Sequence, residues 1–448
     1  MTTGATEREQ WGSRAGFILA AVGSAVGLGN MWRFSYVSAQ GGGIYFVALY
    51  LIFVAMVGIP VMTSEFAIGR LAQQSPAQAL KRLGGDRWSP LGWLFVFCGF
   101  GILSYYSVIA GWTIRYSVDA FRHAIPTDTA AYFGAVSTGS GAVVGHLLFM
   151  AITIFIVLKG IHKGLERAAI IMMPMLFLLI IALAIWSSTL TNAGAGYGAY
   201  LNTDLGNISF MSVVNNAVGQ AFFSLSLGMG ALMTYASYLR SKENLGKEAT
   251  IVAMTDFGVA FTAGLIVFPI IYSFGIADQV GMSMVGALFI ALPAGLQLLG
   301  SSGDWIVLAF FIMLFFAALT SAISLLEVVV TAFIDHGMAR RTAALGAGML
   351  IMLAGIPSAV FNLNLLTAID QIVGNLLLIL GGLLTAILVG WKLLPQADAE
   401  LAQGMSSKAA RKGWALLIKY LIPPVLFVVL ILGVIPATWT SIKTLFGI

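Results

Sequence analysis

The chain alternates long apolar runs with short polar connections, and the runs are long enough to cross a bilayer. A helix needs about 20 apolar residues to span a hydrocarbon core of about 30 Å. Runs of this length lie near residues 14–38, 43–70, 91–121, 142–159, 165–187, 211–240, 248–275, 304–335, 341–361, 365–391 and 414–440. This pattern predicts an all-α polytopic membrane protein with about 11 transmembrane helices.

These runs divide into two sets of five and one additional helix. Because five is odd, the second set would cross the membrane in the opposite orientation to the first. We expect a cytoplasmic N-terminal tail at 1–10, a first five-helix repeat at 11–190, an extracellular loop at 191–210, a second five-helix repeat at 211–395, a cytoplasmic loop at 396–413, and an eleventh helix with the C-terminus at 414–448.

A further apolar segment, Met282 to Gly300, is long enough to be considered as a twelfth crossing. If it crossed, Arg340 and Arg341 would move outside and every later loop would invert. We therefore interpret residues 276–303 as an extracellular hairpin lid that Pro293 breaks.

Two of the expected helices are interrupted by glycine near their middle. In the first, AAVGSAVGLGNMWRF, Gly23, Gly27 and Gly29 precede Asn30; in the sixth, GQAFFSLSLGMGALMTYASY, the interruption lies at Gly228 and Gly230. Unwound backbone at membrane depth is tolerated only where it is buried in protein or lines a watery cavity. Interruptions at matching positions of two repeats predict discontinuous first and sixth helices with a binding site between them.

Composition excludes a soluble protein. Of 448 residues, 59% are hydrophobic and 9% are charged, and the mean hydropathy is +0.95. Cys98 is the single cysteine, so the chain forms no internal disulfide and no thiolate metal cluster. Because Met1 to Gln10 is polar and the first run carries the glycines, we expect no cleaved signal.

The cationic side chains gather in alternate loops, which indicates orientation rather than nucleic-acid binding. With the N-terminus in the cytoplasm, the inside loops hold Arg70, Lys81, Arg82, Arg87, Lys159, Lys163, Arg167, Arg240, Lys242, Lys247, Arg340, Arg341, Lys392, Lys408, Arg411 and Lys412. The loops at 188–210, 276–303 and 362–364 hold none. We expect an integral protein of the bacterial inner membrane, with lipid as its surroundings.

The ends of a broken helix suit a small zwitterion. Free N–H groups attract a carboxylate, while free carbonyls accept an ammonium group or Na⁺. Oxygen ligands for Na⁺ are available on the backbone from Gly23 to Val26 and on the side chains of Asn30, Ser224, Asp256, Thr320 and Ser321. Taken singly, a Ser or Thr in a membrane helix most often bonds its own backbone instead.

Asp256, Glu65 and Glu327 are carboxylates that lie inside expected spans. An ionised Asp256 in the seventh span costs at least about 2.5–3.5 kcal/mol unless it is paired or binds a cation. A position at the inner end of the span, in contact with water, is the alternative. Glu65 is placed to accept N–H groups of the unwound sixth helix, and Glu327 either lines the cavity or reaches water at the inner end.

The runs WGSRAGFILAAVGSAVGLGNMWRF, GGGIYF, GIPVMTSEFAIGR, SYYSVIAGW, GQAFFSLSLGMGALMTYASY and ALTSAIS resemble the neurotransmitter:sodium symporter family, in particular its bacterial leucine-transporter branch. The resemblance covers nearly the whole chain in order. It implies a 5+5 inverted-repeat transporter that carries amino acids with Na⁺ by alternating access.

The resemblance also implies roles for particular residues. A first Na⁺ site would comprise Ala25, Asn30, Ser224, Asp256 and the substrate carboxylate, and a second Gly23, Val26, Ala317, Thr320 and Ser321. The substrate would contact Ala25, Leu28, Gly29, Ile102, Tyr106, Phe223, Ser226, Met229, Ser321 and Leu325. Tyr106 would bind the substrate carboxylate and, with Phe223, close the pocket outward. The gates would be Arg33 with Asp370 outside and Arg8 with Asp335 inside.

The chain departs from the family at two positions. Ser35 stands where the family usually has proline, which affects the stiffness of the outer half-helix. Asp256 stands where animal members have an asparagine that touches Na⁺ and Cl⁻. A fixed carboxylate beside Tyr50, Gln220 and Ser224 would replace the anion, so we expect that chloride is not required.

The expected pocket wall of Ile102, Phe223, Met229 and Leu325 is apolar. Because methionine adapts its shape, we expect hydrophobic or aromatic L-amino acids; the alternative is that Met229 only packs. A small zwitterion of the glycine, taurine or betaine type, a proton-coupled carrier using Asp256 or Glu327, and a receptor that binds without cycling remain alternatives. We expect no enzyme, since no Ser/His or HExxH arrangement is evident, and a monomer or weak dimer.

Overall fold

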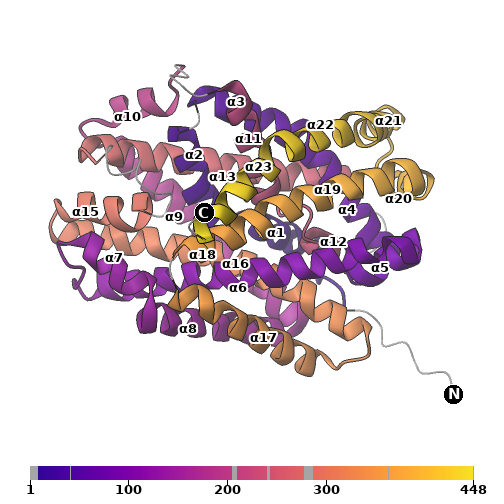
Figure 1. Cartoon of the computed structure of the whole chain (residues 1–448), viewed down its shortest axis with the longest axis horizontal. Helices are drawn as coiled ribbons and strands as arrows, with labels where there is room; N and C mark the ends of the chain where they lie inside the picture. The colour runs from indigo at the N-terminus through magenta and orange to yellow at the C-terminus, as the bar shows by residue number, and fades with distance from the viewer. Residues whose placement is uncertain are drawn as a thin grey trace.

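The computed structural model describes residues 9–40, 42–203, 209–239, 243–276, 286–361 and 363–446, and this part of the chain is helical without strands. Figure 1 shows the helices running side by side along the long axis of the molecule. The first repeat comprises α1 (Arg14–Ala25), η1 (Gly29–Arg33), α2 (Phe34–Gln40), α3 (Ile44–Phe53), η2 (Val54–Gly58), α4 (Ile59–Ala72), α5 (Pro76–Gly84), η3 (Asp86–Trp88), α6 (Ser89–Phe121), α7 (Thr129–Ser137), α8 (Gly139–Leu158), η4 (Ile161–Glu166) and α9 (Arg167–Ser188).

The remaining elements begin with a short helix that packs on α13. They are α10 (Ala193–Tyr200), α11 (Phe210–Ser224), α12 (Ala231–Ala236), α13 (Leu245–Ser273), η5 (Ala287–Ala291), α15 (Leu292–Gln297), α16 (Ser301–Asp335), α17 (Arg340–Val360), α18 (Leu363–Ile369), η6 (Asp370–Leu377), α19 (Leu378–Ile387), η7 (Leu388–Leu393), α20 (Leu394–Ala402), α21 (Lys408–Leu416), η8 (Leu417–Leu421), α22 (Ile422–Val429), η9 (Leu430–Val434) and α23 (Ile435–Phe446). Most η elements are single π-helical turns that continue into the next α-helix.

The predicted spans are found in the described residues. Nine helices are long and apolar enough to cross a membrane, and α1 with η1–α2 forms one further span bent by 56°. The shorter pair α11 and α12 lies at the predicted sixth span. Its interruption and the bend confirm the prediction that the first and sixth helices are discontinuous.

The first break covers Val26 to Leu28. Helix α1 ends when Val26 leaves the helical region at ψ 101°, and the chain becomes helical again at Leu28. The outer half starts as a π-helical turn and continues into α2, which contains the buried Ser35. The outer half is therefore helical without the proline that the family usually has there.

The sixth break lies between Ser224 and Ala231. Its backbone has positive φ at Ser226, Gly228 and Gly230, a conformation that residues other than glycine seldom adopt. A Cβ atom on Gly228 would also overlap the Leu378 carbonyl oxygen. Glycine therefore allows both the turn and the close approach of α19.

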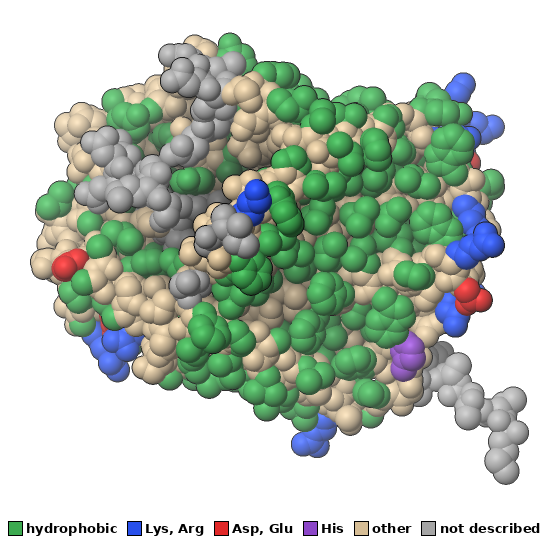
Figure 2. Space-filling view, viewed as in Figure 1, with side chains coloured by type: hydrophobic (Ala, Val, Ile, Leu, Met, Phe, Trp, Pro, Cys, Tyr) green, Lys and Arg blue, Asp and Glu red, His purple; other side chains and the backbone are tan. Residues whose placement is uncertain are grey.

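The longest helices, α6 and α16, pack against each other through the middle of the bundle. Together with α1 and α11 they supply the walls of the pocket described below. In Figure 2 a broad apolar surface covers the middle of one face, while Lys and Arg side chains gather at the end where α20 and α21 lie. This distribution fits a bundle whose middle faces lipid.

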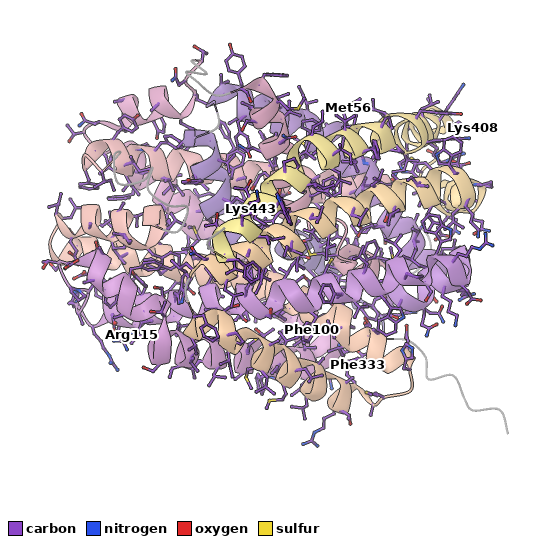
Figure 3. The ribbon with its side chains drawn as sticks, in the orientation of Figure 1. Met56, Phe100, Arg115, Phe333, Lys408 and Lys443 are labelled. Carbon is purple, nitrogen blue, oxygen red and sulfur yellow. The ribbon has the colours of Figure 1, made fainter. Side chains whose placement is uncertain are left out.

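The end of the bundle that we expect to face outward is not free of cations, although the loops singled out in the sequence are. Figure 3 places Arg115 of α6 at the opposite end of the long axis from Lys408 of α21. The Arg115 side chain donates to Asp119 Oδ2 at 2.6 Å, and Tyr132 OH donates to the same oxygen at 2.7 Å. The positive charge of Arg115 is therefore balanced by the Asp119 carboxylate beside it.

The apolar segment after the seventh span forms a short helix, with residues 277–285 lying outside the described part. The apolar helix Leu288–Gln297 is too short to cross a membrane, which agrees with a lid rather than a span. The prediction that Pro293 breaks this segment is wrong. Pro293 lies in the first turn of α15, where the missing N–H is tolerated.

Two further features, helices within residues 396–413 and a contact of His146, were not predicted from the sequence. Residues 396–413, expected as a loop, are largely helical as parts of α20 and α21. No sequence pattern paired a serine with a histidine, yet Ser107 Oγ lies 3.0 Å from His146 Nδ1. His146 Nε2 lies 2.8 Å from the Met352 carbonyl, so the pair joins helices in the buried core.

We expect Gly228→Ala to destabilise the fold by roughly 1–3 kcal/mol, because alanine adds a Cβ where φ is positive. The measurement is thermal unfolding of the purified protein. Gly258→Ala is the matched control, since Gly258 is exposed on α13 and a Cβ atom added there would meet no heavy atom within 4 Å. Equal melting temperatures for the two variants would contradict this explanation.

Candidate solute and cation site

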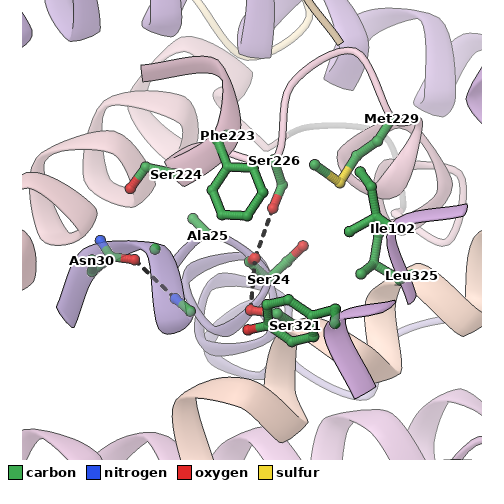
Figure 4. Close-up of a pocket in the computed structure, with 13 residues that line it drawn as sticks. Ser24, Ala25, Asn30, Ile102, Phe223, Ser224, Ser226, Met229, Ser321 and Leu325 are labelled. Carbon is green, nitrogen blue, oxygen red and sulfur yellow. Dashed lines mark hydrogen bonds between the residues drawn. The ribbon is translucent and has the colours of Figure 1, made fainter. Parts of the chain in front are cut away.

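A pocket lies where the two helix breaks meet (Figure 4). Its lining combines the first break, the sixth break and the middle of α6 and α16. The lining residues are Ser24, Ala25, Gly27, Gly29, Asn30, Ile102, Tyr106, Phe223, Ser224, Ser226, Met229, Ser321 and Leu325. Of the residues predicted to contact substrate, only Leu28 is absent from this lining, and it faces the outer cavity described below.

The pocket is polar on one side and apolar on the other. In Figure 4, Met229, Ile102 and Leu325 lie together, away from Asn30 and Ser224. On the polar side Ser226 Oγ donates to the Ser24 carbonyl at 2.7 Å, which ties the sixth break to the first. The cavity volume is only about 20 Å³, room for about one water molecule, so a larger solute requires the apolar side chains to move.

Free backbone groups of the first break have side-chain partners. The Gly27 N–H donates to Asn30 Oδ1 at 2.9 Å, and the Leu28 N–H donates to Tyr106 OH at 3.1 Å. The Gly29 carbonyl accepts a bond of 3.1 Å from Gln220 Nε2. These bonds give the three main-chain groups hydrogen-bond partners that the interrupted helix does not supply.

Asp256 of α13 lies beside the first break and is fully buried. Its carboxylate accepts bonds from Asn30 Nδ2 at 2.6 Å, Tyr50 OH at 2.9 Å and Ser224 Oγ at 2.8 Å. The position at the inner end of the span, reached by water, is thereby excluded. Within the described residues the carboxylate has only neutral donors, so its negative charge has no protein cation to balance it.

Oxygens of α1 and α16 converge at a second position. Ser321 Oγ lies 3.2 Å from the Gly23 carbonyl, 3.4 Å from that of Val26 and 3.3 Å from that of Ala317. Thr320 donates to the Ala317 carbonyl at 3.1 Å, and a Cβ atom on Gly23 would meet the Thr320 side chain. The five residues predicted from the resemblance are therefore neighbours.

This donor set suits Na⁺ rather than a transition metal. Both positions offer hydroxyl, amide, carbonyl and carboxylate oxygens, and hard cations of low charge prefer oxygen. Among the described residues no group of three or more His, Cys, Asp or Glu side chains could hold a metal. Asp256 is a buried carboxylate without a cationic partner among the described residues. Its single negative charge would be balanced by one monovalent cation at the first position.

The carboxylates of Glu65 and Glu327 are bound by other groups of the protein. Glu65 Oε1 accepts the Gly228 N–H at 2.8 Å, as predicted. Glu327 neither lines the pocket nor reaches water: Arg340 Nη2 lies 2.7 Å from its Oε2, and Tyr238 OH donates to its Oε1 at 2.6 Å. Neither alternative expected for Glu327 is found, because the Arg340 guanidinium compensates the charge of the buried carboxylate.

A second, larger cavity of about 360 Å³ lies outside the pocket, and Tyr106 and Phe223 line both. These two rings therefore form the wall between pocket and cavity. Above them Arg33 Nη1 lies 3.9 Å from Asp370 Oδ2, and Arg33 Nη2 donates to Asn375 Oδ1 at 2.7 Å.

Sequence reasoning paired Arg33 with Asp370 but missed the groups around them. Tyr105 OH donates to Asp370 Oδ1 at 2.6 Å, and the nearest partner of Arg33 is Asn375. The polar residues Asp370, Gln371 and Asn375 in an otherwise apolar span were the available signal. At the inner end Arg8 lies outside the described residues, while Asp335 Oδ2 accepts the Ser75 N–H at 2.5 Å.

The fold and site define a class: a helical membrane transporter whose solute and cation positions are built from two broken helices. Comparison with known proteins agrees. Residues 8–140 and 136–445 match the sodium:neurotransmitter symporter family model. The chain belongs to this family, and it is a sodium-dependent transporter rather than an enzyme.

Similar proteins occur in bacteria and in animals. The uncharacterized sodium-dependent transporter YhdH of Bacillus subtilis is 34% identical over 94% of this chain and 96% of its own length. The dopamine transporter of Bos taurus is 25% identical over 96% of this chain and 70% of its own. The crystal structure of MhsT in complex with L-phenylalanine is similar with 38% identity and a TM-score of 0.87, covering 95% of this chain and 99% of that one. The shared architecture is the 5+5 inverted repeat.

We expect Asn30→Ala and Thr320→Ala each to raise the Na⁺ concentration for half-maximal solute binding by about tenfold, or about 1.4 kcal/mol. Asn30 bonds both the Gly27 N–H and Asp256, and Thr320 packs on Gly23 beside the second set of oxygens. The measurement is a Na⁺ titration of amino-acid binding to purified protein. An unchanged Na⁺ concentration for half-maximal binding in both variants would contradict the assignment of Na⁺ sites at these two positions.

Proposed function

We propose that this protein imports hydrophobic or aromatic L-amino acids together with Na⁺ by alternating access. The observation that carries the proposal is the two-sided pocket at the helix breaks, in which Asn30 and Ser224 lie on one side and Ile102, Met229 and Leu325 on the other (Figure 4). The polar side suits the amino and carboxyl groups common to all amino acids. The apolar side offers no charge for a second ionic group, which disfavours charged side chains.

The likeness to MhsT, whose structure contains L-phenylalanine, supports an apolar side chain of the substrate. The narrow cavity must widen to receive such a group. Met229 has flexible torsions suited to this movement, and Phe223 is placed to rotate between the pocket and the outer cavity.

In this proposal Na⁺ occupies both oxygen clusters. The first ion is held by Ala25, Asn30, Ser224 and Asp256 with the substrate carboxylate, and the second by the cluster around Ser321. Moving one charge across 100 mV is worth about 2.3 kcal/mol, so two Na⁺ with a neutral zwitterion gain roughly 4–5 kcal/mol. This gain is sufficient for accumulation before any Na⁺ concentration gradient is counted.

The orientation follows from the distribution of cations in the loops. We place the N-terminus in the cytoplasm of a bacterial cell and the cavity beside Arg33 and Asp370 on the outer side. The repeats at 11–190 and 211–395 then move relative to one another, with residues 276–303 as the outer lid.

The test is uptake into proteoliposomes after an imposed Na⁺ gradient, with each of twenty amino acids as competitor. We expect Na⁺-driven accumulation of label that leucine, phenylalanine or tryptophan blocks, because these side chains match the apolar wall. Uptake that survives a collapsed proton gradient excludes proton coupling. Strong uptake of glycine, taurine or betaine without such competition would favour the small-zwitterion carrier, and binding without uptake would favour a receptor.

Chloride independence is a separate expectation that rests on Asp256. Its buried carboxylate already supplies a negative charge beside the first cation position. We expect replacement of chloride by gluconate to leave uptake within about twofold, whereas Asp256→Asn should abolish uptake in gluconate and regain part of it in chloride. Loss of wild-type uptake in gluconate would refute the assignment.

A further inference from the structure

The N-terminal segment, residues 9–13, is held firmly against the bundle before α1 begins. Trp11 is 7% exposed, and its ring packs edge-on against Phe17, Tyr235 and Tyr238. Its Nε1 donates to the Tyr235 carbonyl at 2.8 Å. The segment is therefore part of the closed inner face and must move if the pocket opens on that side.

Glu166, the last residue of η4, reaches across to this segment with a carboxylate that is 2% exposed. One oxygen accepts the Gly12 N–H at 2.7 Å and lies 2.8 Å from His162 Nδ1. The other accepts the Ser13 hydroxyl at 2.8 Å. Glu166 is thus bound to two consecutive residues of the N-terminal segment.

Ser13 is itself the N-cap of α1, since its Oγ accepts the Gly16 N–H at 2.9 Å. A carboxylate at this position complements the positive end of the helix dipole. Helix α1 has 12 residues, or about 18 Å at 1.5 Å per residue. Its far end carries Gly23 to Val26, so holding Ser13 fixes where the cation-binding carbonyls lie.

A second carboxylate makes the reverse connection. Glu9 Oε2 accepts the N–H of Ile161, the first residue of η4, at 2.6 Å. Glu9 also lies 3.7 Å from Arg340. Each of the two segments therefore supplies a carboxylate to the main chain of the other.

Small residues make room for both contacts. A Cβ atom on Gly16 would overlap the Glu166 carboxylate, and one on Gly12 would overlap the His162 ring. On the other segment, a Cβ atom on Gly160 would lie 2.7 Å from Glu9 Oε2. Side chains at these positions would force the segments apart.

We propose that Glu166 and Glu9 form a reciprocal clasp that positions α1 in the closed inner state and opens as one unit when the pocket opens toward the N-terminal side. Glu166 is a positioning residue: it acts on the cation site through Ser13 and α1. This inference rests on the proposed alternating-access transport. It adds a specific lock between the N-terminal segment and the start of the fifth span.

The test uses Glu166→Gln with a cysteine reporter on the inner face. Replacing Cys98 by Ser removes the only native thiol. Ser237→Cys then places a reporter thiol at a buried position. The neighbouring residue Tyr238 accepts the main-chain N–H of Trp11 through its carbonyl, so the reporter lies beside the N-terminal segment. We expect maleimide labelling without Na⁺ to accelerate at least about threefold. The Na⁺ concentration for half-maximal L-phenylalanine binding should rise at least about threefold, because a smaller fraction of molecules is competent to bind.

Maximal binding at saturating Na⁺ should equal that of the parent, because excess Na⁺ draws the population back to the closed state. Asp119→Asn is the control: Asp119 is also a buried carboxylate that accepts two side-chain donors, but it lies at the outer end. It should change neither labelling nor Na⁺ dependence. Gly16→Ala, which displaces the Glu166 carboxylate without removing its charge, should act like Glu166→Gln.

A double-mutant cycle tests whether the clasp is one unit. Glu9→Gln should shift both readouts in the same direction, and the double variant should shift them by less than the product of the single effects. Unshifted readouts in Glu166→Gln, a loss of maximal binding that saturating Na⁺ does not restore, or purely multiplicative effects would each overturn the clasp. If the parent itself shows no Na⁺-dependent binding, the proposed function fails instead.

Discussion

The structure depends on satisfying main-chain polar groups in the middle of an apolar bundle. An unwound segment at membrane depth leaves N–H and C=O groups without helical partners, and each unsatisfied group is costly where water is absent. Here the partners come from the protein. Tyr106 and Asn30 accept from the first break, Gln220 donates to it, and Glu65 accepts from the sixth. Because most of these partners lie on other spans, the breaks also fix how the spans pack.

The same requirement makes the site suited to a dipolar solute and cations. Groups that are already organised around exposed backbone need little rearrangement to bind a carboxylate, an ammonium group or Na⁺. Ser226 and Ser321 bond carbonyls in the last turn of α1, next to the first break. In the proposed ion-bound state, Na⁺ would take over these carbonyls.

Four buried carboxylates illustrate how surroundings decide their use. Glu327 faces Arg340 and joins helices as an ion pair, while Glu65 holds the sixth break through a main-chain N–H. Glu166 accepts the Gly12 N–H and the Ser13 hydroxyl just before α1 begins. Asp256 lies beside the first break and is surrounded only by neutral side-chain donors in the described residues, which leaves its charge available to a cation. The residue type is nearly the same in each case, and the neighbours differ.

The sequence by itself determined the long apolar spans and the two breaks, and its resemblance to the family indicated most of the residues that line the pocket. Hydrophobic length and mid-span glycines act locally, so they are visible in one dimension. It did not determine the partners of Arg33, where Asn375 is closer than Asp370, or the ion pair of Glu327. It also missed the Ser107–His146 contact, the helical continuation across Pro293 and the order of residues 396–413. Only the tertiary structure decided these, because each depends on which distant helix faces a side chain once the bundle has packed.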